Sequence, residues 1–379
     1  MKKILKIIFF SKKIFNLPSQ KKIVILDRNG FNRVIKPLLG NNDYAILDLR
    51  GESINLLILL LSFFNIFKYG KDAYKITFIK FVNPKIAITC VDTSLNICRF
   101  MNKISSCKLI MIQNGRRNGS ELLSFIKKKI NYELFVDYYF VFSENYANYA
   151  KKFIKGNFII GGSVPNNVYK HSVHRPVKKV QYISEFHPIG IPGDGESYEN
   201  WELKPTNFSL NVIDNFCKDN NLILEILGRT LSHDQEINYY KKFSIKFVYK
   251  KKENDNSNYL AMSEDAIIVA MTSTLLMEAF SRLYRTAFFS IRECYLSKSN
   301  FLKQNNPGFA FPKKTPDFGK FWSNIPNEEN MRKNLDYLLS VDFSDWKSDV
   351  NEWSQYIMKH DYKNNVYKKI LTKEEIYAS

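Results

Sequence analysis

A hydroxyl-rich turn at residues 272–274 has the residue types that most clearly indicate chemistry. The apolar run Ala266–Val269 predicts a buried strand, and Thr274–Leu283 predicts the helix that follows it. Hydroxyl side chains and backbone N–H groups at the start of a helix bind anions, which the positive end of the helix dipole also attracts. We therefore expect Ser273 and Thr274 to bind a phosphate group without a metal, unless both are ordinary helix caps.

Five further polar residues of the second predicted domain follow predicted strands or lie in the same helix: Ser184, Glu185, His187, Arg229 and Glu278. Glu278 lies one helical turn after the hydroxyl-rich turn, where it would reach ribose hydroxyls or remain a solvated acid. Arg229 can bind a phosphate or carboxylate with two hydrogen bonds, or it can pair with a neighbouring acid. His187 is a candidate catalytic residue that would contact a base, a phosphate or a hydroxyl, although a lone histidine is more often structural. We expect Ser184 and Glu185 to contribute to the same nucleotide site.

The first half of the chain offers two candidate general bases. Asp27 and Asp92 each end a hydrophobic run that predicts a strand, at Ile23–Asp27 and Lys85–Asp92. A carboxylate in that position can deprotonate a hydroxyl group, or it can cap the following helix. We favour Asp92 by a small margin. Polar residues of neighbouring loops are the candidates for binding the molecule that carries the hydroxyl: Asn29, Gln113, Asn114 and Arg116.

Short β-branched runs alternate with helix-compatible stretches along most of the chain. Further strands are predicted at Tyr44–Leu49, Lys108–Gln113, Tyr138–Ser143, Asn157–Ile160, Val180–Glu185, Leu222–Leu227, Ile245–Tyr249 and Thr286–Ser290. This alternation predicts an α/β protein with two doubly wound, Rossmann-like domains facing a cleft, followed by C-terminal helices, which is a GT-B-like architecture. In such sheets the functional loops follow the carboxyl ends of the strands, where the candidate residues lie.

The predicted domain boundaries follow changes in this pattern. Residues 1–21 form a basic amphipathic segment, residues 22–165 the first domain, residues 166–179 a polar linker, residues 180–340 the second domain and residues 341–379 a helical segment. Phe186–Thr206, with three glycines and three prolines, reads as a long functional loop or lid. Helices are expected at Glu52–Phe67, Glu121–Lys129 and Asn145–Lys155, among others.

Several segments resemble a known family. They are Gln113-Asn114-Gly115-Arg116, Gly162–Asn167, Tyr182–Glu185, Ser273-Thr274-Leu275, Glu278-Ala279 and Arg285–Ser290. Together they resemble the bacterial O-antigen (surface carbohydrate) biosynthesis proteins from about residue 22 to 315. Family members tend to have Gly-Tyr where this chain has Leu276-Met277, and they tend to have Arg-Gly near the position of Leu283-Tyr284. The expected donor pocket therefore departs from the family pattern, although the hydroxyl-rich turn is retained.

The resemblance implies a GT-B-like fold and a role in building surface polysaccharide such as O-antigen or capsule. The leading hypothesis is a metal-independent cytoplasmic glycosyltransferase that moves a sugar from a nucleotide donor to a lipid-linked or glycan acceptor. His187-Pro188 and Ser273-Thr274 are weakly similar to motifs of transferases that use CMP-linked sugars, which leaves a CMP-linked donor open. A nucleotide-sugar epimerase, a polyol-phosphate transferase and a non-catalytic polysaccharide-assembly protein are the alternatives.

The composition excludes several other classes. The net charge is +19, but only 12 of the 56 basic residues are Arg, so bidentate reading of nucleic-acid bases is not expected. The five cysteines contain no Cys-x-x-Cys pair and no zinc-ligand spacing, and no Asp-x-Asp pair ends a predicted strand. We therefore expect no nucleic-acid partner, no metal and no cofactor other than the nucleotide-sugar substrate.

Two segments suggest a peripheral membrane surface as a further partner. The first 22 residues carry seven Lys, no acid and interleaved Ile and Phe, which can lie in a membrane interface or form a surface helix. The run Ile54–Phe67 contains no charge and is too short to span a bilayer. It is expected to be a core helix or a membrane-docking helix.

Overall fold

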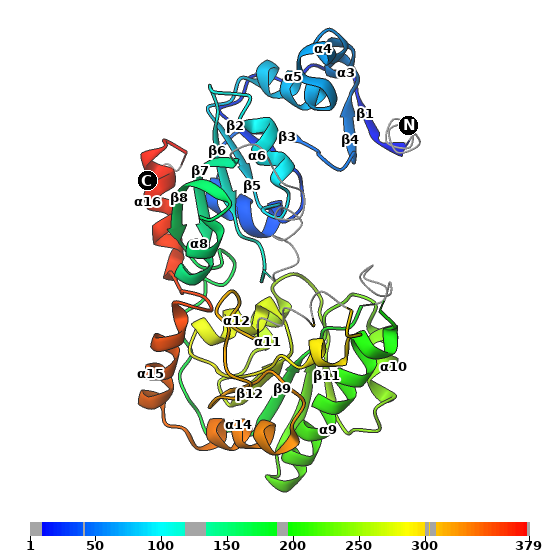
Figure 1. The fold of residues 1–379 in the computed structure, drawn as a ribbon, viewed down its shortest axis with the longest axis vertical. Coiled ribbons are helices and arrows are strands. Elements are labelled where there is room, and N and C mark those ends of the chain that lie inside the picture. The colour runs from blue at the N-terminus through cyan, green and yellow to red at the C-terminus, as the bar shows by residue number, and fades with distance from the viewer. Residues whose placement is uncertain are drawn as a thin grey trace. The chain divides into compact units, whose positions relative to one another are not determined.

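The computed structural model describes residues 10–40, 42–117, 134–187, 196–299, 303 and 308–376, and the chain divides into two compact units (Figure 1). Unit 1 comprises Met1–Asn114, Lys129–Pro165 and Lys363–Ser379, and unit 2 comprises Gly115–Lys128 and Asn166–Tyr362. The chain therefore leaves unit 1 twice and returns to it twice. Unit 1 is built from three separate stretches of sequence.

Unit 1 is built on a six-stranded parallel sheet in the order β3-β2-β5-β6-β7-β8. Its strands are β2 (Ile23–Leu26), β3 (Tyr44–Leu47), β5 (Ile86–Thr89), β6 (Lys108–Ile112), β7 (Leu134–Val141) and β8 (Ile154–Ile160). All six were predicted from the sequence and are confirmed. The central strands β2 and β5 are continuous apolar runs buried along their whole length, as expected where elements pack on both faces of a parallel sheet. The strand order reverses between β2 and β5, so the carboxyl ends of these two strands mark the topological switch point.

The helices of unit 1 include one that comes from the end of the chain. They are η1 (Phe31–Ile35), α2 (Lys36–Leu39), α3 (Leu56–Phe63), α4 (Ile66–Tyr69), η2 (Gly70–Asp72), α5 (Ala73–Val82), α6 (Leu95–Met101), α8 (Glu144–Ala150) and α16 (Asn365–Lys373). The Tyr367 ring of α16 stacks on Phe140 of β7 with the ring centroids 4.3 Å apart. Tyr367 and Leu371 therefore belong to the hydrophobic core of unit 1.

The prediction of one helix over Glu52–Phe67 is wrong. Ser53–Asn55 is strand β4, which pairs in parallel with β1 (Lys12–Ile14) in a separate two-stranded sheet. The Asn55 side chain caps α3 by accepting a hydrogen bond from the Ile58 N–H, so the helix begins only after β4. The described part of the basic N-terminal segment thus contains a strand rather than a surface helix.

Two other helix predictions have different outcomes. The helix expected at Asn145–Lys155 ends at Ala150, because the chain from Ile154 onward forms β8. The helix expected at residues 121–129 lies outside the described residues.

Unit 2 has a second six-stranded parallel sheet, in the order β11-β10-β9-β12-β13-β14. Its strands are β9 (Lys179–Ile183), β10 (Ile223–Leu227), β11 (Val248–Lys250), β12 (Ala266–Ala270), β13 (Arg285–Phe289) and β14 (Trp322–Ser323). The first five confirm predicted strands, and β14 was not predicted. Here the order reverses between β9 and β12, which places the second switch point at residues 184–187 and 271–274.

The helices of unit 2 pack around this sheet. They are η3 (Glu199–Leu203), α9 (Lys204–Asp219), α10 (His233–Lys241), α11 (Ser257–Ala261), α12 (Thr274–Ser281), η4 (Arg292–Tyr295), α14 (Glu328–Ser340) and α15 (Phe343–Ser354). Trp346 of α15 is fully buried against Phe280 of α12, with the ring centroids 5.6 Å apart. The predicted C-terminal helical segment is therefore divided, because α15 belongs to unit 2 and α16 to unit 1.

Parts of the expected linker and of the expected long loop belong to unit 2. In the expected linker, Asn166 and Asn167 are fully buried in unit 2, and the Asn166 amide donates a hydrogen bond to the Ser281 hydroxyl. In the expected loop Phe186–Thr206, the described residues from Glu199 onward form η3 and the start of α9. Residues 188–195 of that loop lie outside the described residues.

Candidate functional site

Three neighbouring strands of unit 2 are tied together at their carboxyl ends. Glu185 follows β9, Thr272 follows β12 and Arg292 follows β13. The Glu185 carboxylate accepts hydrogen bonds from the Thr272 N–H at 2.5 Å and the Thr272 hydroxyl at 2.9 Å. The Arg292 guanidinium lies 2.8 Å from the same carboxylate and also donates to the Thr272 hydroxyl at 3.0 Å. These contacts hold the start of α12 and the start of η4 beside each other.

A second buried carboxylate shares the same arginine. Glu202 of η3 lies 3.4 Å from Arg292, and the indole ring of Trp201 stacks near the Arg292 guanidinium, with 5.5 Å between them. Burial alone would raise the pKa of Glu185, but Arg292 and the Thr272 hydrogen bonds hold that pKa below its usual value. Burial raises the pKa of Glu202 to about 7, against the opposing effect of Arg292. At neutral pH, Glu185 is thus the ionised partner of Arg292, and Glu202 is near its titration midpoint.

A pocket of about 180 Å³ opens beside this cluster. Its lining is rich in cationic side chains and comes from several elements of unit 2: Arg116, Arg117, Trp201, Thr272, Thr274, Arg292 and Glu293. Among the described residues of this lining, Trp201 Nε1, Arg292 Nε and Glu293 Oε2 are buried without a hydrogen-bond partner. A polar ligand in the pocket could satisfy these atoms, because buried polar atoms usually have partners.

Of the two hydroxyl groups at the N-terminus of α12, only that of Thr274 lines this pocket. The Ser273 hydroxyl accepts a hydrogen bond from the Leu275 N–H at 3.2 Å, so Ser273 acts as a helix cap. The Thr274 hydroxyl accepts one from the Arg116 N–H at 2.9 Å and lines the pocket. The two hydroxyls that were expected to act together therefore have separate contacts.

Arg116 lies in unit 2, although it was expected among the acceptor-binding residues of the first domain. Besides its contact with Thr274, its guanidinium donates to the Gly308 carbonyl at 3.1 Å. The chain passes from unit 1 to unit 2 after Asn114. The sequence around residue 114 looks like an ordinary strand followed by a loop, so it gave no sign of this crossing. Of the site residues expected from the sequence, Arg116 and Thr274 are the two that line this pocket.

The expected donor-binding residues Ser184 and Arg229 and the expected catalytic residue His187 form a neighbouring cluster. Arg229 donates to the Glu185 carbonyl at 2.9 Å and to His187 Nδ1 at 3.0 Å. Since an arginine can only donate, His187 Nδ1 accepts and the imidazole is neutral. Burial, together with Arg229 and Arg292, lowers the pKa of His187, which agrees with that state. The Ser184 hydroxyl is buried and bonded to Glu236, so it points into the core of the unit.

Glu278 lies inside unit 2 and not in the pocket lining. Its carboxylate accepts a hydrogen bond from the Tyr259 hydroxyl at 2.8 Å, and its side chain is buried. One turn later, the buried Arg282 guanidinium lies 5.0 Å from the ring of Tyr169 and 5.7 Å from that of Tyr259. Glu278 therefore faces a cluster of aromatic rings and one arginine.

In unit 1 the switch point brings three loops close together. Gly30 has a φ of +74°, and a Cβ atom there would lie 2.6 Å from Cys90 Sγ and 2.7 Å from the Asn114 amide. Asn29 is exposed, and its carbonyl accepts a contact from Cys90 Sγ at 2.7 Å. The loops after β2, β5 and β6 are therefore in contact, and only glycine fits at their meeting point.

Both candidate bases are buried at this edge and have partners. Asp27 has a φ of +80°, accepts a hydrogen bond from the Asn29 N–H at 2.9 Å and lies 3.2 Å from Arg50. Asp92 accepts a hydrogen bond from the Tyr139 hydroxyl at 2.8 Å. The arrangement brings both carboxylates to the end of the sheet where the sequence suggested they would lie.

The two remaining acceptor candidates differ in their exposure. Gln113 is buried, and its side-chain oxygen accepts a hydrogen bond from the Phe142 N–H at 2.8 Å, so it joins β6 to the end of β7. The Asn114 side chain is partly exposed and accepts a hydrogen bond from Arg33 at 3.0 Å.

Sequence reasoning missed Arg292, Thr272, Trp201 and Arg117. Arg292 follows the predicted strand Thr286–Ser290 by two residues, and Thr272 is the first residue of the hydroxyl-rich turn. The rule that functional loops follow strand ends could therefore have identified both. Trp201 had no such signal, because its position depends on a helix within the expected loop.

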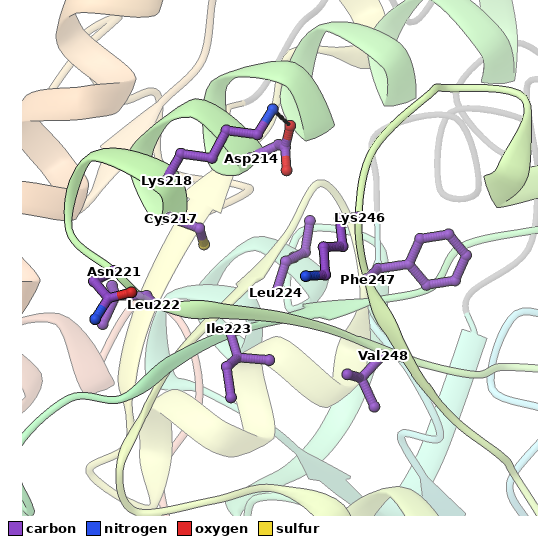
Figure 2. A pocket seen from close by; sticks show the side chains of 10 residues that line it. All are labelled: Asp214, Cys217, Lys218, Asn221, Leu222, Ile223, Leu224, Lys246, Phe247 and Val248. Carbon is purple, nitrogen blue, oxygen red and sulfur yellow. Dashed lines mark ion pairs between the residues drawn. The ribbon is translucent and has the colours of Figure 1, made fainter.

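A larger pocket, of about 360 Å³, lies at the amino ends of strands β10 and β11 of the same sheet. Figure 2 shows its lining, which comes from the end of α9, the start of β10 and the residues that lead into β11. Lys218 and Asp214 form an ion pair at its rim, 2.5 Å apart. Because it lies at the amino ends of the strands, where parallel sheets rarely carry function, we assign the site to the smaller pocket.

The described residues offer neither a metal-binding cluster nor a membrane-crossing helix. In that part of the chain, no group of three or more His, Cys, Asp or Glu side chains is placed to hold a metal ion. Within the same residues, no helix has both the length and the apolar composition needed to cross a bilayer.

Comparison with known proteins gives a family match in sequence. The model of a family described as "putative O-antigen biosynthesis protein" matches residues 110–375, well over half of the chain. No curated protein matches the sequence.

Solved structures match over nearly the whole chain. A crystal structure titled "putative UDP-N-acetylglucosamine 2-epimerase from Listeria monocytogenes" has a TM-score of 0.53 and 12% identity, over 94% of this chain and 96% of that one. A UDP-GlcNAc 2-epimerase from Methanocaldococcus jannaschii has a TM-score of 0.49 and 11% identity, over 94% and 99%. The wall teichoic acid polymerase TagF has a TM-score of 0.46 and 12% identity, over 94% and 89%. At 12% identity, the match with a TM-score of 0.53 shows only that the chain has a GT-B-like fold.

Proposed function

The chain belongs to the family of O-antigen biosynthesis proteins whose model matches residues 110–375, and we propose that it is a glycosyltransferase of bacterial surface polysaccharide biosynthesis. In this proposal it transfers a sugar from a nucleotide-linked donor to a lipid-linked or glycan acceptor. It acts on the cytoplasmic side of the membrane, and it requires no metal ion.

The arginine-rich pocket of unit 2 is the observation that carries this proposal. Among the described residues, three arginines line this pocket, Arg116, Arg117 and Arg292, and Arg292 is also paired with Glu185. Arginine binds phosphate oxygens with paired hydrogen bonds, and the positive end of α12 adds to this attraction. The Thr274 hydroxyl then positions the Arg116 backbone beside the phosphate group.

Unit 1 would bind the acceptor through the exposed Asn29 and the partly exposed Asn114. Asp92 is the proposed base that removes the proton of the acceptor hydroxyl, and Asp27 is the alternative. Asp27 lies 3.2 Å from Arg50, whereas the Asp92 carboxylate accepts a hydrogen bond from the Tyr139 hydroxyl at 2.8 Å. The variants described in the Discussion decide between the two.

Nucleotide binding is tested by measuring the melting temperature with CMP, CDP, UDP and GDP, with and without EDTA. A ligand at a hundred times its Kd stabilises the folded state by about 2.7 kcal/mol, so one nucleotide should raise the melting temperature clearly. Arg117→Ala should remove most of the shift. Lys246→Ala, which removes one positive charge from the other pocket, is the matched control and should keep it. If no nucleotide shifts the wild-type protein, or if the two variants behave alike, the pocket assignment is wrong.

A nucleotide-sugar epimerase is the second candidate function, since the similar structure with a TM-score of 0.53 carries that description. An epimerase converts its donor without an acceptor, whereas a transferase consumes the donor only when an acceptor is present. Incubating the protein with the nucleotide sugar alone, followed by NMR of the sugar, separates the two. An epimerised sugar in the absence of acceptor would replace the transferase proposal.

A further inference from the structure

An apolar face covers one end of unit 1. Large side chains of α3, α4 and the turn between them are exposed, including Leu60, Leu61, Phe63, Phe64, Ile66 and Phe67. Phe64 is 85% exposed and Phe67 is 98% exposed. Monomeric soluble proteins rarely expose so many neighbouring large apolar side chains, so this face is expected to contact a partner.

The face is a fixed part of the fold. The opposite side of α3 packs on α5 through Ile58, which is fully buried, and the Asn55 side chain caps the helix. Asn65, between α3 and α4, donates a hydrogen bond to Thr77 of α5 at 3.1 Å. The exposed phenylalanines are therefore held outward by packing on α5 and are not the remainder of an incomplete core.

The small sheet lies beside the start of α3 and carries further exposed apolar side chains. Strand β1 pairs with β4 so that Ile14 lies beside Asn55, and the Asn55 side chain also donates to the Asn16 carbonyl at 2.7 Å. Phe15 and Leu17 on either side of Asn16 are exposed. Figure 1 shows β1, β4, α3 and α4 together at one end of unit 1.

The charges around this face are mostly positive. The exposed lysines of the described residues 10–17 and 56–71 are Lys12, Lys13, Lys68 and Lys71, and these two stretches contain no Asp or Glu. One exposed acid, Glu52, lies beside the start of β4, and Asp72 is buried within 3.5 Å of Lys75, Arg99 and Lys103. A partner that matches this face must be apolar where the phenylalanines lie and anionic around them.

We infer that this face docks on the surface of an anionic lipid bilayer. Phe64 and Phe67 enter the boundary between headgroups and acyl chains, and the four lysines contact anionic headgroups. Helix α3 has eight residues, far fewer than the roughly 20 that span a bilayer, so this face would lie on the membrane surface and not cross it. A second copy fits less well, because a two-fold contact would bring the lysines of both copies together.

The inference is tested by flotation of the full-length protein with phosphatidylglycerol-containing vesicles and with pure phosphatidylcholine vesicles. We expect binding to the anionic vesicles that weakens as salt rises. Phe64→Ser with Phe67→Ser should reduce the partition coefficient at least tenfold. The matched control is Leu231→Ser with Leu260→Ser, which changes two unit 2 side chains that are 68% and 73% exposed and should leave binding unchanged.

A charge variant separates the electrostatic contribution from the apolar one. Lys68→Gln with Lys71→Gln should reduce binding to anionic vesicles by about thirtyfold at low salt and leave binding to neutral vesicles unchanged. Point substitutions are used because deleting the N-terminal 20 residues would also remove β1. Absence of anionic-vesicle binding, or equal binding by the phenylalanine variant and its control, would overturn the inference.

Two further measurements distinguish membrane docking from self-association and from a defect in the nucleotide pocket. Sedimentation equilibrium without lipid shows whether the phenylalanine variant changes the oligomeric state, and a dimer that dissociates in this variant would replace the membrane with a second copy. Nucleotide-induced thermal shifts should be equal in the wild type and all these variants, because the pocket lies in unit 2. A variant that loses lipid binding but keeps nucleotide binding therefore reports on the membrane-docking face alone. A wild-type protein that binds lipid but no nucleotide would contradict the proposed reaction and leave the docking face supported.

Discussion

The Arg292 guanidinium and the Glu185 carboxylate form a buried ion pair, 2.8 Å apart, that joins the ends of β13 and β9 across the end of β12. The Thr272 hydroxyl lies between them and bonds to both. Because all three groups follow adjacent parallel strands, the pair fixes the relative positions of the loops that line the pocket. Its loss should affect the stability of unit 2 and the shape of the pocket together.

Arg292→Met should lower the free energy of unfolding by about 3–5 kcal/mol, because it leaves the buried Glu185 charge without its partner. The double variant Glu185→Gln with Arg292→Met should recover part of this loss, since the Glu185 charge is then removed as well, whereas Glu202 still lacks its arginine partner. Urea unfolding followed by circular dichroism measures both. An Arg292→Met protein as stable as the wild type would show that the pair does not form in solution.

Glu202→Gln should change how stability depends on pH. The folded-state pKa of about 7 lies above the usual value of 4.5, so the folded state binds the proton more tightly than the unfolded state does. The contribution of Glu202 to stability is therefore greatest below about pH 4.5 and falls by roughly 3 kcal/mol as pH rises through 7. Glutamine lacks this loss, so the variant should gain stability relative to the wild type between pH 5 and 8.

Urea unfolding of both proteins at pH 5, 6, 7 and 8 measures that difference. Other ionisable groups contribute equally to the two proteins and cancel in the comparison. A difference that stays constant over this range would mean that Glu202 titrates normally.

Ser273→Ala and Thr274→Ala should have separable effects. Ser273 caps α12, so its loss should cost about 0.5–2 kcal/mol of stability, with a smaller effect on nucleotide binding. Thr274 bonds to the Arg116 backbone and lines the pocket, so its loss should weaken nucleotide binding about tenfold. Thr274→Ser keeps the hydroxyl and should bind normally. Calorimetric titration gives the affinities, and unchanged affinity in the folded double variant would refute the phosphate role of this turn.

Asp92→Asn should abolish sugar transfer and leave donor affinity nearly intact, because the proposed base lies in unit 1 and the donor pocket in unit 2. Asp27→Asn is the matched control. Asparagine tolerates the left-handed backbone of residue 27, so this variant should fold. Transfer assays with each purified variant, alongside nucleotide titrations, decide between them. An inactive Asp27→Asn beside an active Asp92→Asn would show that the other strand end supplies the base.

The regular part of the fold was readable from the sequence because it depends on local patterns. Runs such as Ile-Val-Ile-Leu at residues 23–26 and Ala-Ile-Ile-Val-Ala at residues 266–270 are buried on both faces, so their composition alone indicates a central parallel strand. Strands β1 and β4 carry no such signal. Each has three residues, and its partner lies about 40 positions away along the chain.

The candidate site was only partly readable for a related reason. Strand ends could be located, but the sheet order that places β12 between β9 and β13 could not, so the contact between Glu185 and Arg292 was not predicted. Arg116 shows the same limit, because its assignment to unit 2 follows from where the chain crosses between the units. Burial also could not be read from residue type: Ser184 and Glu278 are polar and nevertheless interior.

The placement of α16 in unit 1 has a consequence for biosynthesis. Tyr367, Leu371 and Ile376 belong to the core of unit 1 but are translated after the whole of unit 2. Because α16 is translated after unit 2, the sheet of unit 1 lacks it until then, and the surface on which Tyr367 stacks stays uncovered. Apolar surface that is exposed before folding is complete makes a chain prone to aggregation.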